Sequence, residues 1–404
     1  MNILLFSQRF WPENFRINNI AESLRKKNNI FVVTEKPNYP DGNIKKKYKK
    51  SFFFNEIWKN IKIYRSPTIS RGKNSKLNLL LNYINFIIIS PIVLSKNLKK
   101  KKIDIIFVYA TSPIFQALPA IIYGKLNSIP VVLWVQDIWP DVLKDLGIIK
   151  NRLALIIINY FVKIIYNNSD YIFVQSLSFK KKISKYSDKK IKILYNPETK
   201  KIINKNFNKI NKNFIITYAG NIGKAQSFDT LIEALKKINK PKFKIYIYGD
   251  GSEKNKLLKD INKFNLEKTV KVFKPISKSE IDIVLSKSNA FLLILGSGDG
   301  LSSTLPAKLQ TYIAHNKPIV VSANGESYNF VKKNKLGFVS KAGNSTGLSQ
   351  SILDVQKLKK KNLNLIKKRS LMLFKNNFEI NEWTRILEQK LENCAEDYKR
   401  CKVY

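Results

Sequence analysis

The segment Phe214-Ile-Ile-Thr-Tyr-Ala-Gly-Asn-Ile-Gly-Lys-Ala-Gln-Ser-Phe228 decides the fold. It begins as an apolar strand over Phe214–Tyr218, continues through a loop of small residues and leads into a helix near Ser227. These are the parts of a βα unit whose strand lies inside a parallel sheet. Free N–H groups at a helix start bind phosphate, and glycine lets a ligand approach the backbone. The segment therefore predicts an α/β fold with a phosphate site, or else a tight turn without a ligand.

The same alternation of apolar strands and helical segments extends in both directions along the chain. Downstream strands are expected at Lys244–Tyr248, Val270–Phe273, Ala290–Leu295, Pro318–Ser322 and Gly337–Ser340. Upstream strands are expected at Ile3–Ser7, Ile30–Thr34, Ile61–Tyr64, Ile103–Tyr109, Pro130–Val135, Tyr171–Gln175 and from Ile191. Such alternation predicts parallel strands joined by helical crossovers. We therefore expect two doubly wound α/β domains in tandem, followed by helices to about Tyr398.

The domain boundaries follow from composition and length. With 404 residues, the chain is long enough for two domains. A Lys/Asn-rich stretch over residues 200–212 has no core pattern and is interpreted as the linker. We predict one Rossmann-like domain over residues 1–195, a second over 196–375, and a C-terminal helix over 376–404 that packs back on the first domain. A ligand cleft between the two domains, at the carboxyl ends of the strands, is expected.

The charge of the chain is unusual. It has 73 Lys and Arg against 29 Asp and Glu, a net charge of +44, although 44% hydrophobic and 25% charged residues exclude disorder and collagen-like repeats. Nucleic acid, an anionic membrane surface, and a lysine-rich source composition could each account for it. Only nine of the basic residues are Arg, and the Lys residues are scattered. This favours an anionic membrane surface or a lysine-rich source composition, because proteins that recognise nucleic-acid bases directly prefer Arg.

Cysteine usage and the N-terminus indicate the compartment. The chain has two cysteines, Cys394 and Cys401, which exclude a disulfide framework and fit a reducing cytoplasm. The start of the chain lacks the features of a signal peptide and is predicted to be a strand.

Two apolar stretches could contact lipid. The first, Leu77–Leu94, contains three asparagines and Pro91, and the second, Leu153–Tyr166, is shorter and contains Lys163. Both fall short of the roughly 20 clean apolar residues of a membrane span. They are interpreted as helices buried against a sheet, or, for the first stretch, as an in-plane helix beside the lysines at 99–102.

Further motifs at strand ends could bind a nucleotide-sugar. Gly249-Asp-Gly251 follows a strand and forms either a ligand loop or only a turn. The segment from Gly296 to Pro306 is rich in glycine and hydroxyl groups and leads into a helix carrying Lys308. It can present hydroxyls, backbone N–H groups and one cation to a sugar diphosphate. In so lysine-rich a chain, Lys308 could equally be a solvated surface residue.

In the first domain, two strand-end loops carry candidate site residues. Arg9, Glu13 and Arg16 follow the first strand. Asp137 and Trp139 follow another, and the indole could stack on a sugar; a buried turn with a capping aspartate is the alternative. His315, the only histidine, is expected at a helix end, not in catalysis. Walker, H-E-x-x-H, G-x-S-x-G and D-x-D motifs are all missing.

Taken together, these motifs resemble the retaining glycosyltransferases of family four, which have the GT-B fold, over essentially the whole chain. Within that family, the chain looks like the bacterial N-acetyl-L-fucosamine transferase-like subgroup of O-antigen and capsule assembly. The matching segments are Phe10-Trp-Pro-Glu13, Thr111-Ser-Pro113, Gln136-Asp-Ile-Trp-Pro-Asp141, Gly220-Asn-Ile-Gly223 with Gln226, Gly249-Asp-Gly251, and Leu305-Pro-Ala-Lys-Leu-Gln-Thr-Tyr312 with Lys317-Pro318.

The resemblance implies a site on each domain. A UDP-sugar would bind the second domain through Gly220, Asn221, Gly223, Gln226, Gly249, Ser303, Thr304, Leu305 and Lys308. The acceptor would bind the first, and Asp137, Lys308 and Glu13 would act in catalysis. Several of the family's polar anchors are replaced: the Arg and Lys of its phosphate loop fall on Asn221 and Gln226, its two glutamates on Ser303 and Thr311, and its first-domain histidine at or beside Gln136. Lys308 is then the first candidate to neutralise the diphosphate, followed by Lys224, Arg9 and Arg16.

The function implied is retaining, metal-independent sugar transfer from a UDP-sugar to a lipid-diphosphate-linked acceptor. No cofactor is expected beyond the UDP-sugar donor, and no nucleic acid partner. The enzyme would be cytoplasmic and peripheral on the inner membrane. Two alternatives stay open: a UDP-sugar epimerase on the same fold, disfavoured by the single histidine, and a basic nucleic-acid-binding protein, disfavoured by the absence of Arg-rich or aromatic-interleaved stripes.

Overall fold

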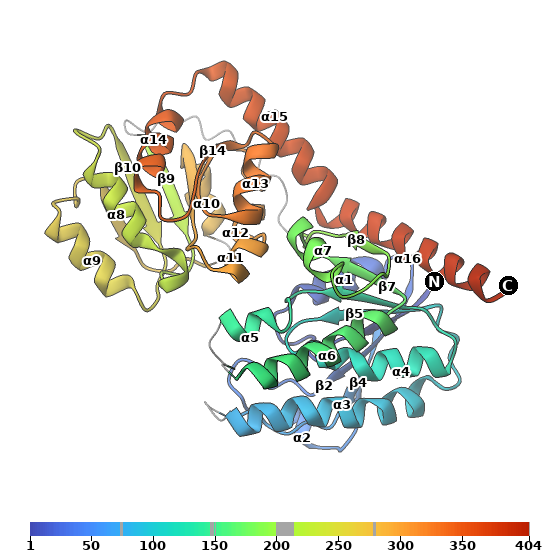
Figure 1. Cartoon of the computed structure of the whole chain (residues 1–404). Helices are drawn as coiled ribbons and strands as arrows, with labels where there is room; N and C mark the ends of the chain where they lie inside the picture. Colours follow the sequence, from blue (N-terminus) through green and yellow to red (C-terminus); the bar gives the residue numbers. More distant parts are fainter. Residues whose placement is uncertain (73–75, 146–148, 150, 199–213, 278–279, 404) are drawn as a thin grey trace. The chain divides into compact units, whose positions relative to one another are not determined.

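The chain divides into two compact α/β units (Figure 1). The computed structural model describes residues 1–72, 76–145, 149, 151–198, 214–277 and 280–403. Unit 1 comprises Met1–Pro197 and Ile380–Tyr404, and unit 2 comprises Glu198–Glu379. The predicted boundaries, after 195 and after 375, lie close to these divisions. The predicted linker at 200–212 lies outside the described residues.

Unit 1 is built on a sheet of eight described strands in the order β3-β4-β2-β1-β5-β6-β7-β8. The strands are β1 (Asn2–Phe6), β2 (Asn29–Glu35), β3 (Phe54–Trp58), β4 (Ile61–Ser66), β5 (Ile105–Ala110), β6 (Val131–Val135), β7 (Tyr171–Val174) and β8 (Ile191–Ile193). All neighbouring strands are parallel except β3 and β4, which pair antiparallel. The edge strand β3 was missed because its side chains alternate and do not form an apolar run.

Helices cover both faces of this sheet. They are α1 (Arg16–Leu24), α2 (Lys46–Lys49), α3 (Lys76–Leu98), α4 (Leu118–Leu126), α5 (Asp141–Asp145), α6 (Arg152–Asn168), α7 (Leu177–Ile183) and α16 (Ile380–Val403), with a 3-10 turn at Ile114–Ala117. Alternate strand residues point to opposite faces. Leu4 and Phe6 therefore pack toward α3, α4 and α6, whereas Ile3 and Leu5 pack toward α1 and α16.

The two apolar stretches form helices that are only partly buried. Helix α3 is longer than the predicted Leu77–Leu94 stretch, and by length and composition its residues Leu77–Leu98 could cross a membrane. Only 28% of that apolar window is buried, and α6 likewise exposes Leu153, Ile156 and Tyr160. The expectation of two buried helices is therefore wrong: each packs one side on the sheet and presents an apolar side outward.

Unit 2 contains a parallel sheet of six described strands in the order β11-β10-β9-β12-β13-β14. The strands are β9 (Phe214–Ala219), β10 (Phe243–Tyr248), β11 (Val270–Phe273), β12 (Ala290–Ile294), β13 (Ile319–Ser322) and β14 (Gly337–Ser340). The helices are α8 (Phe228–Lys236), α9 (Lys254–Lys263), α10 (Ile281–Ser286), α11 (Asp299–Ser303), α12 (Ala307–Ala314), α13 (Gly325–Lys333), α14 (Ser345–Gln356) and α15 (Lys360–Asn377), with a 3-10 turn at Lys224–Gln226. Two parallel-sheet α/β units and a helical C-terminal region confirm the predicted fold class.

Both faces of the second sheet are also covered. Leu292 of β12 points to a core shared with α8, α9 and α14. Its neighbour Phe291 points to the other side, where its ring stacks on Tyr312 of α12 at 4.7 Å between centroids. Because β9 lies in the middle of the sheet, the loop after it is held between the loops that follow its neighbours β10 and β12.

Candidate active site

Glycines bring the loops after β9 and β10 into backbone contact. The Gly220 N–H donates to the Tyr248 carbonyl at 2.9 Å, and the Ile222 N–H donates to the Asp250 carbonyl at 2.8 Å. A Cβ on Gly249 would lie 1.9 Å from the Gly220 oxygen, so no side chain fits there. Gly220 also has φ +146°, a conformation that favours glycine. The predicted loop residues Gly220, Asn221 and Gly249 are therefore gathered at one edge of the sheet.

Lys308 lies directly against this loop. It is the second residue of α12, and a Cβ on Gly220 would lie 2.8 Å from its Nζ. Nζ donates to the Tyr218 hydroxyl at 2.6 Å and lies 4.1 Å from the centroid of the same ring. Burial lowers the pKa of Lys308 to about 8. Lys308 is thus a partly buried cation held beside the glycine loop, and the surface-lysine alternative does not describe it.

Tyr218 positions Lys308. The phenol accepts from Lys308 and donates to the Asn221 carbonyl at 2.5 Å, so it connects the lysine to the loop. Burial raises the pKa of Tyr218, which keeps the hydroxyl protonated. Next to it, the Tyr312 hydroxyl accepts the Ala219 N–H at 2.9 Å. Two buried tyrosines therefore fix the end of β9 relative to α12.

The Gln226 side chain accepts a hydrogen bond from one of the backbone amides that were expected to bind phosphate. Its Oε1 accepts the Gly223 N–H at 3.0 Å and the Asn221 side-chain amide at 3.3 Å. Helix α8 begins only at Phe228, after Ser227 in a left-handed conformation. The loop amide of Gly223 therefore already has a partner, which a phosphate oxygen would replace.

The hydroxyl groups before α12 bond within their own segment. Ser303 donates to the Asp299 carbonyl at 2.9 Å and Thr304 to the Leu301 carbonyl at 3.4 Å, while Leu305 is buried. Helix α12 has Pro306 at its N-cap, with no side-chain cap. In the structure these residues shape the start of α12, from which Lys308 projects.

Glu198 brings a carboxylate to α12 that sequence reasoning missed. Its Oε2 accepts the Thr311 hydroxyl at 2.8 Å. Thr311 is one turn beyond Lys308, at a position where the resembled family has a glutamate. The contact joins residues 113 positions apart, so no local pattern could have indicated it. Nor did Asn196-Pro197, which reads as a turn, point to a function for the residue that follows.

In unit 1, Arg9 and Glu13 belong to a buried polar network. Arg9 forms a buried ion pair with Glu35, which is 1% exposed. Burial raises the pKa of Glu35, and the Arg9 guanidinium opposes that increase. Glu13 accepts the backbone N–H groups of Asn38 and Tyr39 at 2.9 and 2.7 Å. These contacts give Arg9 and Glu13 a structural role at the ends of β1 and β2, and they leave Arg9 paired with Glu35, so it is not a free cation.

Asp137 lies at the carboxyl end of β6 and is partly exposed. Its Oδ2 accepts both the N–H and the hydroxyl of Ser112, at 3.1 and 2.8 Å. The Trp139 indole donates to the same hydroxyl at 3.1 Å. The Tyr109 side chain is close by, and burial raises its pKa to about 12. Asp137 thus caps the loop after β5, as one alternative predicted, and keeps one oxygen outside these bonds to Ser112.

His315 and Lys317 make structural contacts. The His315 ring contacts the Thr311 carbonyl at 2.8 Å and Asp282 at 3.3 Å, within the core around α12. Lys317 donates to the Leu285 and Ser286 carbonyls at the end of α10, and burial lowers its pKa to about 8. Over the ranges that the structure describes, no group of three or more His, Cys, Asp and Glu residues is placed to hold a metal ion.

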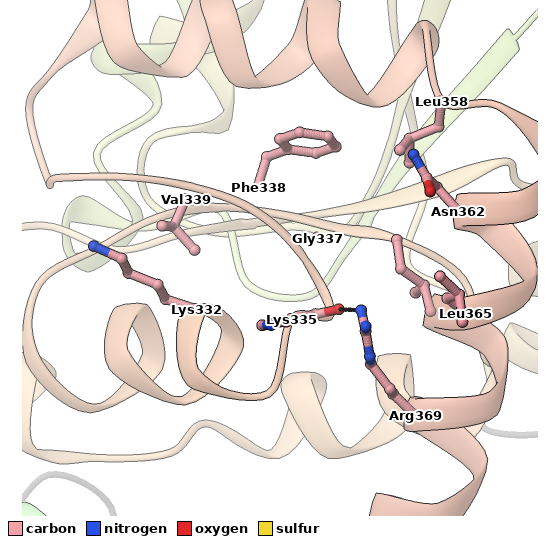
Figure 2. Close-up of a pocket in the computed structure, with 10 residues that line it drawn as sticks. Lys332, Lys335, Gly337, Phe338, Val339, Leu358, Asn362, Leu365 and Arg369 are labelled. Carbon is pink, nitrogen blue, oxygen red and sulfur yellow. Dashed lines mark hydrogen bonds between the residues drawn. The ribbon is translucent and has the colours of Figure 1, made fainter.

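A surface pocket of about 300 Å³ lies elsewhere in unit 2, between β14, α13 and α15 (Figure 2). Arg369 donates to the Lys335 carbonyl at 3.4 Å at its edge, and Phe338 is among the residues that line it. None of the predicted site residues lines this pocket. It is therefore separate from the loop around Lys308.

The family comparison concerns unit 2. Residues 199–371 match the model of the family described as glycosyl transferases group 1. The comparison with curated proteins finds no match. The second unit, with the Gly220 loop and Lys308, thus carries a glycosyl transferases group 1 domain.

Solved structures with the same fold match nearly the whole chain. A glycosyltransferase from Rickettsia africae matches with a TM-score of 0.68 and 14% identity, covering 97% of this chain and 98% of that chain. Anabaena HepE in complex with UDP and glucose matches with a TM-score of 0.65 and 15% identity, covering 97% of this chain and 99% of that chain. The lipopolysaccharide outer core galactosyltransferase WaaB, in its apo form, matches with a TM-score of 0.66 and 16% identity, covering 99% of this chain and 100% of that chain. The fold is GT-B, and with the matched domain it supports a transferase.

Proposed function

We propose that the chain transfers a sugar, such as N-acetyl-L-fucosamine, from a UDP-sugar to a lipid-diphosphate-linked acceptor in O-antigen or capsule synthesis. Transfer would retain the anomeric configuration and need no metal ion or other cofactor. The observation that carries the proposal is the partly buried Lys308, held by Tyr218 against the Gly220 loop. The glycosyl transferases group 1 domain spans these residues, and HepE was solved with UDP and glucose.

In the donor site, Lys308 would neutralise the diphosphate. The Gly220 loop lets phosphate oxygens approach the backbone, and the uncapped start of α12 adds N–H groups directed at negative charge. As the bond between the sugar C1 and the diphosphate oxygen breaks, negative charge builds on that oxygen. A fixed cation in a site that excludes water stabilises this charge more than it stabilises the bound donor. Glu198, which lies beside Thr311, would accept a hydrogen bond from a hydroxyl group of the donor sugar.

Retention is proposed to follow from attack on the same face as the leaving group. The acceptor oxygen forms the new bond to C1 while the departing diphosphate takes the acceptor proton. No protein base is then required, which agrees with the structural contacts of His315 and Glu13. Asp137, on unit 1, would orient an acceptor hydroxyl through its partly exposed carboxylate.

A transfer assay tests the proposal. The protein is incubated in EDTA with a panel of UDP-sugars and a polyprenyl-diphosphate-linked sugar, and lipid-linked product is followed by mass spectrometry. We expect one donor to give a product with the donor's anomeric configuration. No product from any donor overturns the transferase proposal, and isomerised UDP-sugar without acceptor indicates the epimerase. An inverted product, or transfer restored only by Mg²⁺ or Mn²⁺, overturns the mechanism.

Asp137→Asn is expected to lower kcat for transfer by about 10²-fold with little change in UDP affinity, because the carboxylate would act on the acceptor. Steady-state kinetics together with UDP calorimetry separate the two quantities. Asp141→Asn is the matched control, since Asp141 follows this loop as the first residue of α5 and pairs with Lys182 at 2.6 Å. An unchanged kcat in Asp137→Asn would leave Asp137 with only its capping role.

A further inference from the structure

Helix α3 buries asparagine side chains together with part of its apolar residues, and its outer side carries a row of exposed large apolar side chains. Asn82 is fully buried and donates to Glu35 at 3.0 Å, and Asn85 donates to the Pro67 carbonyl at 2.7 Å. The opposite side carries large apolar side chains between 38% and 64% exposed, at helical spacing. They are Leu77, Leu80, Leu81, Ile84, Ile88 and Ile92. In a helix whose outer side faces water, the outer side chains are normally polar or charged.

Helices α4 and α6 extend the apolar surface. Helix α4 packs against both α3 and α6, and all three lie on the same side of the first sheet (Figure 1). We call the exposed apolar side chains of α4 and α6, together with those of α3, the α3–α4–α6 face. The further members are Ile122 and Leu126 of α4, and Leu153, Ile156, Ile157, Tyr160 and Phe161 of α6. Exposed apolar side chains gathered in this number on neighbouring helices mark an interaction site.

The three helices of this face carry charges of one sign only. The sequences of α3, α4 and α6 contain no aspartate or glutamate. Lys96, Lys125 and Lys163 are exposed on the three helices, and Lys99 and Lys100 follow the end of α3. Lys96 also lies 4.8 Å from the Phe53 ring, which connects α3 to the segment after the lysine-rich helix α2. An apolar surface with a basic margin is complementary to a bilayer that contains anionic lipids.

We propose that the α3–α4–α6 face docks in the plane of an anionic bilayer, with α3 lying along the surface and not crossing it. Crossing would pull Asn82 and Asn85 from their protein partners into hydrocarbon, where unsatisfied amides are costly. Docking in the plane keeps those bonds and buries only the Leu and Ile side chains. On the cytoplasmic leaflet, it would hold unit 1 where a lipid-linked acceptor is found. This membrane docking rests on the proposed function and deepens it, but the experiment measures binding to vesicles and does not depend on sugar transfer.

Vesicle co-sedimentation of the full chain tests the proposal. We expect binding to vesicles of phosphatidylglycerol and phosphatidylethanolamine, weaker binding to phosphatidylcholine, and weakening by 0.5 M salt. The triple variant Leu80→Ser, Ile84→Ser, Ile88→Ser should lower the vesicle partition coefficient at least about 10-fold. Its matched control is Leu258→Ser, Ile283→Ser, Met372→Ser, which changes exposed apolar residues of unit 2 and should bind as the parent chain does.

Charge and depth are tested separately. Lys96→Gln, Lys99→Gln, Lys100→Gln should weaken binding to anionic vesicles severalfold, whereas Lys359→Gln, Lys360→Gln, Lys361→Gln should not. Alkaline carbonate should release the bound protein, because no segment crosses the bilayer. Retained UDP binding and an unchanged thermal midpoint show that each variant is folded. The proposal is overturned if the parent chain stays in the supernatant, if the apolar triple variant binds normally, if carbonate fails to extract the protein, or if the face instead mediates a dimer that the triple variant dissociates.

Discussion

Replacing Lys308 by alanine is expected to lower kcat/KM for sugar transfer by about 10²-fold or more. The substitution removes the partly buried cation beside the Gly220 loop, and preorganised charges of this kind stabilise the transition state strongly. The Tyr218 hydroxyl would lose its donor but keep its bond to the Asn221 carbonyl. Steady-state kinetics at pH 7 with a saturating acceptor measure the effect.

The pH dependence of UDP binding gives this prediction a second readout. Burial lowers the pKa of Lys308 to about 8 in the free protein, and a bound diphosphate favours the charged form. The dissociation constant of UDP should therefore be flat between about pH 7, where the terminal phosphate is fully ionised, and pH 8, and rise toward tenfold per pH unit above pH 8. Lys308→Arg keeps its charge and should remove this rise, and Lys308→Ala should show weak binding at every pH.

Lys224 supplies the matched control. It lies in the turn between Gly223 and Gln226 but is exposed, so Lys224→Ala should change transfer and UDP affinity no more than severalfold. If Lys308→Ala kept a near-normal kcat/KM while Lys224→Ala lost it, the diphosphate would be assigned to the wrong lysine.

Arg9→Met is expected to destabilise unit 1 by about 3–5 kcal/mol at pH 8. It leaves the buried Glu35 carboxylate without its ion-pair partner, and an uncompensated buried charge is among the costliest single changes. All five tryptophans, at positions 11, 58, 134, 139 and 383, lie in unit 1, so tryptophan fluorescence follows the unfolding of this unit alone.

The loss should depend on pH with a defined sign. Burial raises the folded-state pKa of Glu35 above its unfolded value, and removing Arg9 raises it further. Such a group favours the folded state while protonated, and this contribution is lost as pH rises through the folded-state pKa. Arg9→Met should therefore be less destabilised at pH 5 than at pH 8.

Two further variants check the cause. Adding Glu35→Gln to Arg9→Met should recover most of the lost stability, because the buried charge is gone. Arg385→Met breaks an exposed pair with Glu382 in the same unit and should cost less than about 0.5 kcal/mol. Equal destabilisation by Arg9→Met at pH 5 and pH 8, with no recovery in the double variant, would mean that lost packing and not charge is responsible.

The sequence predicted the strands well because buried parallel strands are continuous apolar runs. Phe214–Tyr218 and Ile103–Tyr109 stand out for this reason, and both are central strands of their sheets. Strand β3 has no such run, since an edge strand is covered on fewer sides and can alternate. Helix α3 shows the opposite difficulty: its Leu and Ile residues occur all around the helix, so periodicity could not tell a buried face from an exposed one.

Some residues of the candidate site could likewise be predicted from the sequence, and others could not. The glycines and Lys308 could be found because they occur within short segments at strand ends. Glu198 and Glu35 could not, since their partners Thr311 and Arg9 come from other strand-end or helix segments. The position of Gln226 on the Gly223 amide also depends on loop conformation, which composition does not determine.

The return of α16 to unit 1 has a consequence for how the protein is made. Trp383 and Leu387 complete the core that contains Trp134, and the Trp383 indole donates to the Tyr195 carbonyl at 2.6 Å. A ribosome delivers β1 first and α16 last, with all of unit 2 in between. Unit 2 can therefore fold while unit 1 still lacks one of its covering helices. Unit 1 is therefore the first unit to be synthesised and the last to be completed. Until α16 is made, the part of its core around Trp134 lacks the cover that Trp383 and Leu387 provide.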